Sequence, residues 1–447
     1  MNACRKDLIG CQDCGHIFDK PACPHGEELS CQHCGAVLLV NRKDWLTKAV
    51  AFTLTGIILF GVTLSVPFLG LEAAGQTQSS HLVSSVEALL ERKQFLLATL
   101  VFVTVVLFPL AELIGLSYVL GARMLERRAP GFKWVLHMLF LARPWNMMEI
   151  FFLGMLVTAV KLGDLAELQP GIGVFTFAGL VVVLILSHMH LSREELWDWI
   201  KEENYHTMGN REGATGSPVD EEFVTCRTCR AMVSMALIED NARCPRCQSP
   251  LSTHHAQSYQ RSLGLLVAAA VLFIPANTLP IMTTATFGTT TSNTIFSGVV
   301  HLIEEGALGI AAVVFVASIM VPIAKFLIMG YLLWAVKHPG TGTPEQQITL
   351  YRMIEFVGRW SMIDVFVVAL LVSLVQFGSL TSIEPGVAIL CFAAVVVLTM
   401  MAAETFEPRL IWDAYNEHEK EPHEKNRDDA SEVKSRHIMA ITSRSQN

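Results

Sequence analysis

This sequence contains two sets of four cysteines. The sets are Cys11, Cys14, Cys31 and Cys34, and Cys226, Cys229, Cys244 and Cys247. Each set consists of two C-x2-C pairs, separated by 16 residues in the first set and by 14 in the second. Four thiolates that two short turns bring together form a closed tetrahedral site, which structural zinc prefers. The spacing therefore predicts two zinc ions, one in each cysteine ribbon.

Other uses of these cysteines remain open on the sequence alone. Each ribbon could hold two disulfides, although thiols that stay in the cytoplasm are kept reduced. A four-sulfur site also suits iron, as in iron-sulfur or rubredoxin-like centres, which would give the protein a redox role. Cys23 and His25 lie inside the first ribbon and have no counterpart in the second. Because both Cys4 sets are complete without them, we do not expect either residue to be a ligand.

The composition is that of a membrane protein. Of the 447 residues, 52% are hydrophobic and 17% are charged, and the mean hydropathy is +0.43. Eight apolar runs can cross or nearly cross a bilayer, which takes about 20 residues. They are about Leu46 to Leu69, Phe95 to Leu120, Trp145 to Leu162, Ile172 to Leu191, Leu263 to Pro280, Ala307 to Val336, Ser361 to Phe377 and Val387 to Ala403. The net charge of −8, without a basic stripe, gives no indication of a nucleic-acid partner.

The charges of the connections predict the orientation. Basic residues gather in the second connection (Arg123, Arg127, Arg128, Lys133 and Arg143) and in the sixth (Lys337, Arg352 and Arg359). Residues 281–306, between the fifth and sixth runs, contain no lysine or arginine. Cytoplasmic loops of membrane proteins carry the excess of basic residues. With an even number of spans, we expect both termini and both ribbons to be cytoplasmic.

The two halves of the sequence match each other at an offset of 213 to 215 residues. Both cysteine sets match, Pro67 matches Pro280, and Trp145 matches Trp360. Because each half has four spans, both halves enter the membrane from the same side, so the repeats must be parallel. The predicted fold class is an all-α multipass membrane protein with two parallel repeats of four transmembrane helices, each preceded by a small Cys4 zinc ribbon. The expected parts are a first ribbon (1–44), a first transmembrane repeat (45–200), a linker (201–222), a second ribbon (223–258), a second transmembrane repeat (259–413) and a disordered tail (414–447).

Six of the ionisable residues within or at the ends of the apolar runs are candidates for function. They are Glu112, Lys325, Glu149, Asp364, Glu404 and Lys161. A charge at the bilayer centre costs about 2.5 to 3.5 kcal/mol by insertion scales, so these residues are candidates for a transport path. Glu112 follows Pro109 by three residues, and Lys325 follows Pro322 in the same way. Parallel repeats would place this acid and this base at matching depths, facing each other or a shared polar cavity. The alternative is that some of the six lie at helix ends in the headgroup zone, as Lys161 would by snorkelling.

Paired Cys4 ribbons, each leading into four spans with a proline in the second, resemble the paraquat-inducible protein A family, which includes PqiA and LetA (also called YebS). The resemblance covers the chain up to about Asp413, and the C-x2-C pairs are its most specific element. It implies a bacterial inner-membrane protein that works with periplasmic MCE proteins, whose rings stack into tunnels towards the outer membrane. The expected role is to move phospholipid between the two membranes by loading or unloading the tunnel.

Two other functions fit the same residues. A membrane redox protein would use iron or reactive thiols in the ribbons, and it would show visible absorbance and iron content. A non-transporting anchor would only hold the tunnel, and its intramembrane charges could be neutralised without effect. The sequence contains no Walker, G-x-S-x-G, H-E-x-x-H or dinucleotide-binding motif, so we do not expect an enzyme.

Overall fold

The computed structural model describes the chain from residue 4 to residue 418 with several gaps. It does not describe residues 6–7, 20–22, 25, 74–75, 128–129, 164–166, 200–222, 227, 235–242, 250, 252–255, 287–288, 305, 307 and 375–380. His25, the predicted linker 201–222 and residues 419–447 of the predicted tail therefore lie outside the described residues. Residues 409–418 are helical, so helix continues past the predicted start of the tail at residue 414.

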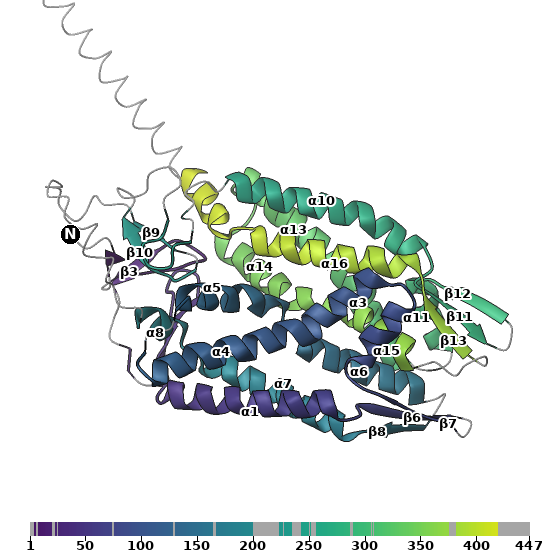
Figure 1. The fold of residues 1–447 in the computed structure, drawn as a ribbon. Coiled ribbons are helices and arrows are strands. Elements are labelled where there is room, and N and C mark those ends of the chain that lie inside the picture. Colours follow the sequence, from purple (N-terminus) through teal and green to yellow (C-terminus); the bar gives the residue numbers. More distant parts are fainter. Residues whose placement is uncertain are drawn as a thin grey trace, which may run out of the picture.

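Most of the described chain is helical, and the helices run roughly along one long axis (Figure 1). The cysteine ribbons lie at one end of this bundle, called the ribbon end below, and small β-sheets lie at the other end. Seven helical segments among the described residues are long and apolar enough to cross a membrane. The protein is therefore a multipass membrane protein with its two cysteine sets at one end.

The first group of helices follows the first ribbon. Its elements are α1 (Trp45–Ser65), β6 (Leu69–Ala73), β7 (Gln76–Ser80), α2 (Ser84–Glu91), α3 (Phe95–Phe102), η1 (Val103–Leu107), α4 (Phe108–Met124), α5 (Phe132–Ala142), η2 (Arg143–Trp145), α6 (Met148–Gly163), β8 (Glu167–Pro170), α7 (Ile172–His190) and α8 (Arg193–Asp198). Helix α1 packs along α7, and α4 packs against α1 and α5.

The second group follows the second ribbon. Its elements are α10 (Ala256–Thr278), β11 (Met282–Thr286), β12 (Thr289–Asn293), α11 (Ile295–Glu304), α12 (Leu308–Phe315), η4 (Val316–Met320), α13 (Val321–Lys337), α14 (Pro344–Gly358), η5 (Arg359–Met362), α15 (Ile363–Leu374), β13 (Thr381–Pro385) and α16 (Val387–Thr405). From α10 to α16, helices and strands follow one another in the same order as from α1 to α7. Helix α10 packs along α16, and α15 packs against α6 of the first group.

The third and seventh predicted spans differ from the expected apolar runs. The third begins earlier, because α5, the 3-10 turn η2 and α6 together form one apolar segment over Phe132–Val160. The seventh contains α15, which has only 12 described residues and follows directly on α14 and the 3-10 turn η5. Several basic residues that we assigned to connections therefore lie in helical elements: Lys133 and Arg143 in the third segment, and Arg352 and Arg359 in the seventh. Both segments are thus broken helices whose basic residues lie in or before the break.

A π-helical turn precedes the proline of the second helix in each group. The turn η1 ends just before α4, which has Pro109 in its first turn, and η4 ends just before α13, which has Pro322 there. Proline has no N–H and its ring clashes with the carbonyl four residues earlier, so a continuous α-helix cannot pass through it undisturbed. A π-turn takes up this disturbance by adding a residue to one turn, and such turns are frequent at functional sites.

The expectation of an all-α protein was wrong at the end opposite the ribbons. There β7, β6 and β8 form one antiparallel sheet, and β12, β11 and β13 form another. The runs over β11 and β12 are rich in threonine, a β-branched residue that favours strands. A Cβ on Gly171 would lie 2.4 Å from the Pro67 carbonyl oxygen, and one on Gly386 would lie 2.1 Å from that of Pro280. Only glycine therefore fits at the start of α7, beside the end of α1, and at the start of α16, beside the end of α10.

The two groups meet along α6 and α15, in the middle of the bundle (Figure 1). Gly154 of α6 permits a close approach, since a Cβ there would lie 3.2 Å from Phe366 Cβ and 3.5 Å from the Ile363 carbonyl oxygen. Most of the described side chains of α15 are buried, and Phe366 packs edge-on against Phe151. This apolar contact holds the two groups together between the ribbon end and the sheets.

Candidate metal centres and intramembrane polar sites

The structure brings the four thiols of the first set together. Their sulfur atoms all lie within 4.8 Å of one another, with 3.5 Å between Cys11 and Cys34 and 3.6 Å between Cys14 and Cys31. Each C-x2-C pair lies in a tight turn closed by a hydrogen bond, from Gly15 N to the Cys11 carbonyl in one case. Gly15 and Gly35 end these turns with positive φ angles of 74° and 69°. The turns are held by the short hairpins β2–β3 (Leu8–Gly10, Ile17–Asp19) and β4–β5 (Glu28–Ser30, Val37–Val40).

The second set has the same geometry and is buried more deeply. The sulfur of Cys226 lies 3.5 Å from that of Cys247, and the sulfur of Cys229 lies 3.6 Å from that of Cys244. All four residues are buried, whereas Cys14 and Cys34 of the first set are partly exposed. The strands β9 (Phe223–Thr225) and β10 (Met232–Ser234) support the first of its turns.

The thiols of both sets are free and can act as metal ligands. A tetrahedral zinc ion with sulfur ligands about 2.3 Å away places those sulfurs about 3.8 Å apart, close to the separations in both sets. In the first set, hydrogen bonding from Cys14 lowers the pKa of Cys11 to about 5, whereas burial raises the pKa of Cys34 to about 12. Several thiolates cannot share so small a space without a cation, so the arrangement fits a metal ion.

Cys23 lies outside this group of four. Its thiol donates to the carbonyl oxygen of Glu27 over 3.4 Å, and its own carbonyl accepts from the Asn41 amide over 2.7 Å. Among the described residues, the two groups able to hold a metal are the two Cys4 sets themselves.

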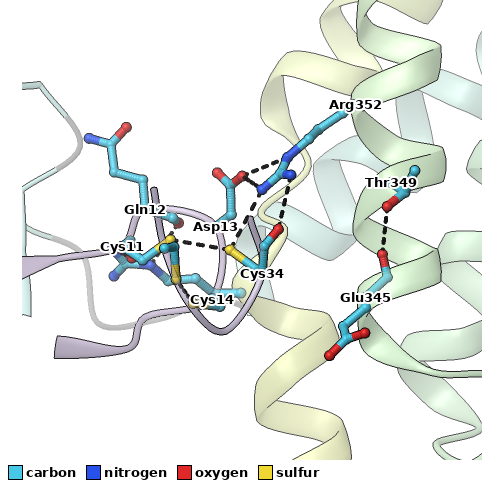
Figure 2. Close-up of polar contacts among 10 residues, drawn as sticks. Cys11, Gln12, Asp13, Cys14, Cys34, Glu345, Thr349 and Arg352 are labelled. Carbon is cyan, nitrogen blue, oxygen red and sulfur yellow. Dashed lines mark hydrogen bonds and ion pairs between the residues drawn. The ribbon is translucent and has the colours of Figure 1, made fainter. Parts of the chain in front are cut away.

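The first ribbon docks on the second group of helices. Arg352 of α14 donates to the Asp13 carboxylate from Nε over 3.0 Å and from Nη2 over 2.5 Å, and its Nη1 donates to the Cys34 carbonyl over 3.1 Å (Figure 2). Arg409 donates to the carbonyl oxygens of Gln12 and Cys11 over 3.0 and 3.4 Å. Such charge-assisted, two-pronged contacts are stronger and more directional than neutral hydrogen bonds. The first ribbon is thus bound to α14 and to Arg409, which lie far from it in the sequence.

The second ribbon docks on the first group of helices, so the two ribbons are crossed. Its four cysteines share a buried cluster with Leu196 and Trp197 of α8. Arg246 donates to the Trp197 carbonyl over 3.2 Å, and Arg193 donates to the Thr228 carbonyl.

The ribbons also contact each other. Strand β1 (Cys4–Arg5) pairs with β10, and Arg230 donates to the Leu38 carbonyl over 2.9 Å. A cavity of about 360 Å³ lies at this junction, lined by Arg230, Arg352, Asp13 and Glu355 together with backbone of the first ribbon. The two cysteine sets are therefore parts of one assembly, which the sequence did not indicate.

Lys325 of α13 is buried among hydroxyl groups. Only 3% of it is exposed, and its Nζ donates to Ser361 Oγ over 2.9 Å and to Thr399 Oγ1 over 3.3 Å. Each hydroxyl donates its own hydrogen to a backbone carbonyl, Ser361 to that of Gly358 and Thr399 to that of Val396. Their lone pairs therefore face the lysine. Ser361 lies in η5, so the break in the seventh segment is the feature that presents it.

Glu112 of α4 has different partners. It is 5% exposed, its Oε1 contacts His188 Nε2 of α7, and its Oε2 accepts from Asn146 Nδ2 over 2.6 Å. Asn146 directly follows the 3-10 turn in the break between α5 and α6. Glu112 and Lys325 thus lie at matching places, each three residues after its proline, but each hydrogen-bonds within its own group of helices. Our expectation had not included His188, Asn146, Ser361 or Thr399.

The other candidates of the transport path lie elsewhere. Glu149 is exposed in the first turn of α6, and Asp364 is buried in the first turn of α15. Glu404 is exposed near the end of α16. Lys161 belongs to α6, but its side chain lies outside the described part of the structure. Glu149 and Glu404 are thus exposed, whereas Asp364 is buried like Glu112 and Lys325.

Comparison with known protein families finds one match to each of the two groups of helices. The sequence profile of the family described as Paraquat-inducible protein A matches residues 46–201 and again residues 259–416. The chain belongs to this family. The intermembrane transport protein PqiA of Escherichia coli (strain K12) is 34% identical over 413 residues, which are 92% of this chain and 97% of that protein. The resemblance noted from the cysteine ribbons and spans is thereby confirmed.

Two further relatives have informative names. The lipophilic envelope-spanning tunnel protein A of Escherichia coli (strain K12) is 30% identical over 413 residues, 92% of each chain. A probable intermembrane transport protein of Haemophilus influenzae (strain ATCC 51907 / DSM 11121 / KW20 / Rd) is 28% identical over 416 residues, 92% of this chain and 96% of the relative. No solved structure matches the chain.

Proposed function

We propose that this protein is a bacterial inner-membrane subunit that moves phospholipid between the two membranes of the envelope, together with a periplasmic MCE-family protein. The names of its relatives, which describe intermembrane transport and an envelope-spanning tunnel, support this role. The multipass helical bundle supplies a membrane-embedded body from which a lipid can be taken up.

The observation that carries the proposal is the environment of Lys325. A lysine buried in an apolar bundle needs a counter-charge, water or loss of its proton. The hydrogen bonds of its amino group go to two neutral hydroxyls, which orient it without neutralising it. A phospholipid has an anionic phosphate that would supply the missing charge. We therefore assign Lys325 to the binding of a lipid phosphate along the transport path, with Glu112, Glu149, Asp364, Glu404 and Lys161 as further candidates.

We further infer that the two groups of helices are parallel repeats of four spans. Their shared order of elements and the two matches of the family profile support the repeat. Both ribbons lie at the end where the basic residues Arg123 and Lys337 end their helices, which supports a cytoplasmic location for the ribbons and both termini. In that reducing compartment each Cys4 set would hold one zinc ion, two in the chain.

Substitution of Lys325 tests the function. In a strain that lacks the native protein, Lys325→Ala should abolish complementation of envelope integrity while expression and zinc content stay normal. Lys325→Arg asks whether charge alone suffices, since guanidinium is rarely deprotonated and has a different shape. Lys337→Ala is the matched control, because Lys337 is an exposed lysine in the last turn of the same helix.

Lipid analysis makes the result specific. Mass spectrometry should find phospholipid bound to the purified wild-type protein and less of it bound to Lys325→Ala. Full complementation by Lys325→Ala, with unchanged lipid content, would contradict the transport role and favour a membrane anchor.

A further inference from the structure

The carboxylate of Glu112 ties three parts of the first group of helices together. Glu112 lies on α4, its partner His188 lies in the last turn of α7, and its partner Asn146 lies in the break between α5 and α6. The carboxylate is almost completely buried, while 17% of the His188 side chain is exposed. His188 is therefore the more exposed member of the acid–histidine pair.

Asn146 determines where a mobile proton can lie. Its Oδ1 faces the Met148 backbone N–H over 3.5 Å, so its Nδ2 points to Glu112 Oε2. An amide N–H can only donate, which keeps Oε2 an acceptor. The exchangeable proton is then confined to the other side of the carboxylate, between Glu112 Oε1 and His188 Nε2. A buried acid and a histidine that share one proton form a neutral pair, which the low-dielectric interior favours.

Charged or titratable residues lie on several elements around the pair, including Lys133 and His137 of α5, which packs against α4. Arg143, in the same break as Asn146, interacts electrostatically with Glu112. Arg359 and Glu149 in turn interact electrostatically with Arg143. Helix α1, which packs against both α4 and α7, has Lys48 in its first turn as its only charged residue. In the second group, the position equivalent to Glu112 is Lys325. At this position the first group thus has an acid and the second group a base.

We propose that Glu112 and His188 form a proton-binding site that makes transport depend on pH; this rests on the proposed transport function. Loss of the shared proton to water would leave the carboxylate facing a neutral imidazole. Their charge-assisted hydrogen bond would weaken, and α4 would be held less firmly to α7. Return of a proton from water restores the bond. The cycle involves proton transfer only, with no change in redox state.

Two variants, each of which removes one titratable member of the pair, test the site. Glu112→Gln keeps groups that can bond to Asn146 and His188, and His188→Gln keeps an N–H donor, but neither side chain binds a proton in the working range. The transfer of fluorescent phosphatidylethanolamine is measured from vesicles that contain the full-length protein and its partner. Glu126→Gln is the control, since Glu126 is an exposed carboxylate just after the same helix.

The expected result is a difference in pH profile. A single linked proton changes the wild-type rate by up to about tenfold per pH unit on one side of its midpoint, as it should in Glu126→Gln. Across about pH 5.5 to pH 8.5, the rate of His188→Gln should stay nearly constant, and the pH profile of Glu112→Gln should be displaced from that of the wild-type protein. A wild-type pH profile in both variants would overturn the proposal.

A second measurement does not depend on transport. In ¹⁵N-histidine NMR of the full-length protein, the signal that His188→Gln lacks should respond to pH, and Glu112→Gln should alter that response. An invariant His188 signal would overturn the proton site even if phospholipid moves. If the wild-type protein transfers no phospholipid but His188 titrates together with Glu112, the proposed function fails and the proton site stands.

Discussion

The two groups of helices have the same framework but opposite chemistry at one place. In both, a π-turn and a proline precede the ionisable residue, and a broken helix supplies a polar partner next to it, Asn146 in one and Ser361 in the other. In the first group the residue is an acid that faces donors, and in the second it is a base that faces acceptors. The backbone thus makes the polar position available, while the side chains decide whether it suits a proton or an anion.

The comparison extends to the ribbons, where removal of ligands should have the largest effect. Cys226→Ser with Cys229→Ser should halve the zinc content and unfold the second ribbon, since metal binding to such a site contributes about 10 to 16 kcal/mol in zinc-finger peptides. The partly exposed first set should lose zinc to a chelator sooner than the fully buried second set. Elemental analysis during chelation measures both. Unchanged zinc in the double variant would contradict the assignment of ligands, and loss of the two ions at equal rates would contradict the difference in burial.

Exchange of the two charges tests whether the polar sites are separate. Lys325→Glu places a buried carboxylate among hydroxyls whose hydrogens bond to the backbone, which should cost about 3 to 5 kcal/mol, as does breaking a buried pair. Glu112→Lys should be similarly harmful beside His188. If the sites are separate, the double exchange is additive within about 0.5 kcal/mol. Thermal unfolding in detergent measures the change, and rescue by the double exchange would show that the two residues face each other after all.

Removal of the neutral partners should have the smallest effect and should differ between the groups. Asn146→Ala leaves one oxygen of a buried carboxylate without its donor, which should cost about 1 to 3 kcal/mol. Ser361→Ala leaves Lys325 its hydrogen bond to Thr399, so we expect a smaller loss of stability than for Asn146→Ala. The same unfolding measurement compares the two variants. A larger loss for Ser361→Ala would mean that the lysine depends on its hydroxyls more than the acid depends on its amide.

The sequence was a good guide wherever the determining pattern is local. Both C-x2-C pairs predicted that Cys11 and Cys34 would meet, since the turn that each pair forms is fixed by a few neighbouring residues. The length of an apolar run predicted where helices lie, and the prolines marked the disturbed turns. The third span was misjudged because a 3-10 turn at Arg143–Trp145 divides it, and charged residues before that turn resembled a loop.

The partners of the intramembrane residues could not be predicted in the same way. Lys325 and Thr399 are 74 positions apart, and Glu112 and His188 are 76 apart. Their contact depends on how each helix is rotated, and a helix turns by about 100° per residue, so a small error in rotation exchanges one partner for another. The asparagine and serine that follow the two matched tryptophans were a usable signal. The threonine-rich run over β11 and β12 was another, because it favours a strand over an irregular loop.

The crossed ribbons impose an order on the synthesis of the chain. The first ribbon leaves the ribosome early, but its docking residue Arg352 follows Asp13 by 339 positions. At about 5 to 20 residues per second, that separation corresponds to roughly 17 to 70 seconds during which Arg352 is not yet present to bind Asp13. The second ribbon meets α8 without delay, since Arg246 and Trp197 are only 49 positions apart. We therefore expect the N-terminal ribbon, although made first, to be the last part of the ribbon end to complete its docking.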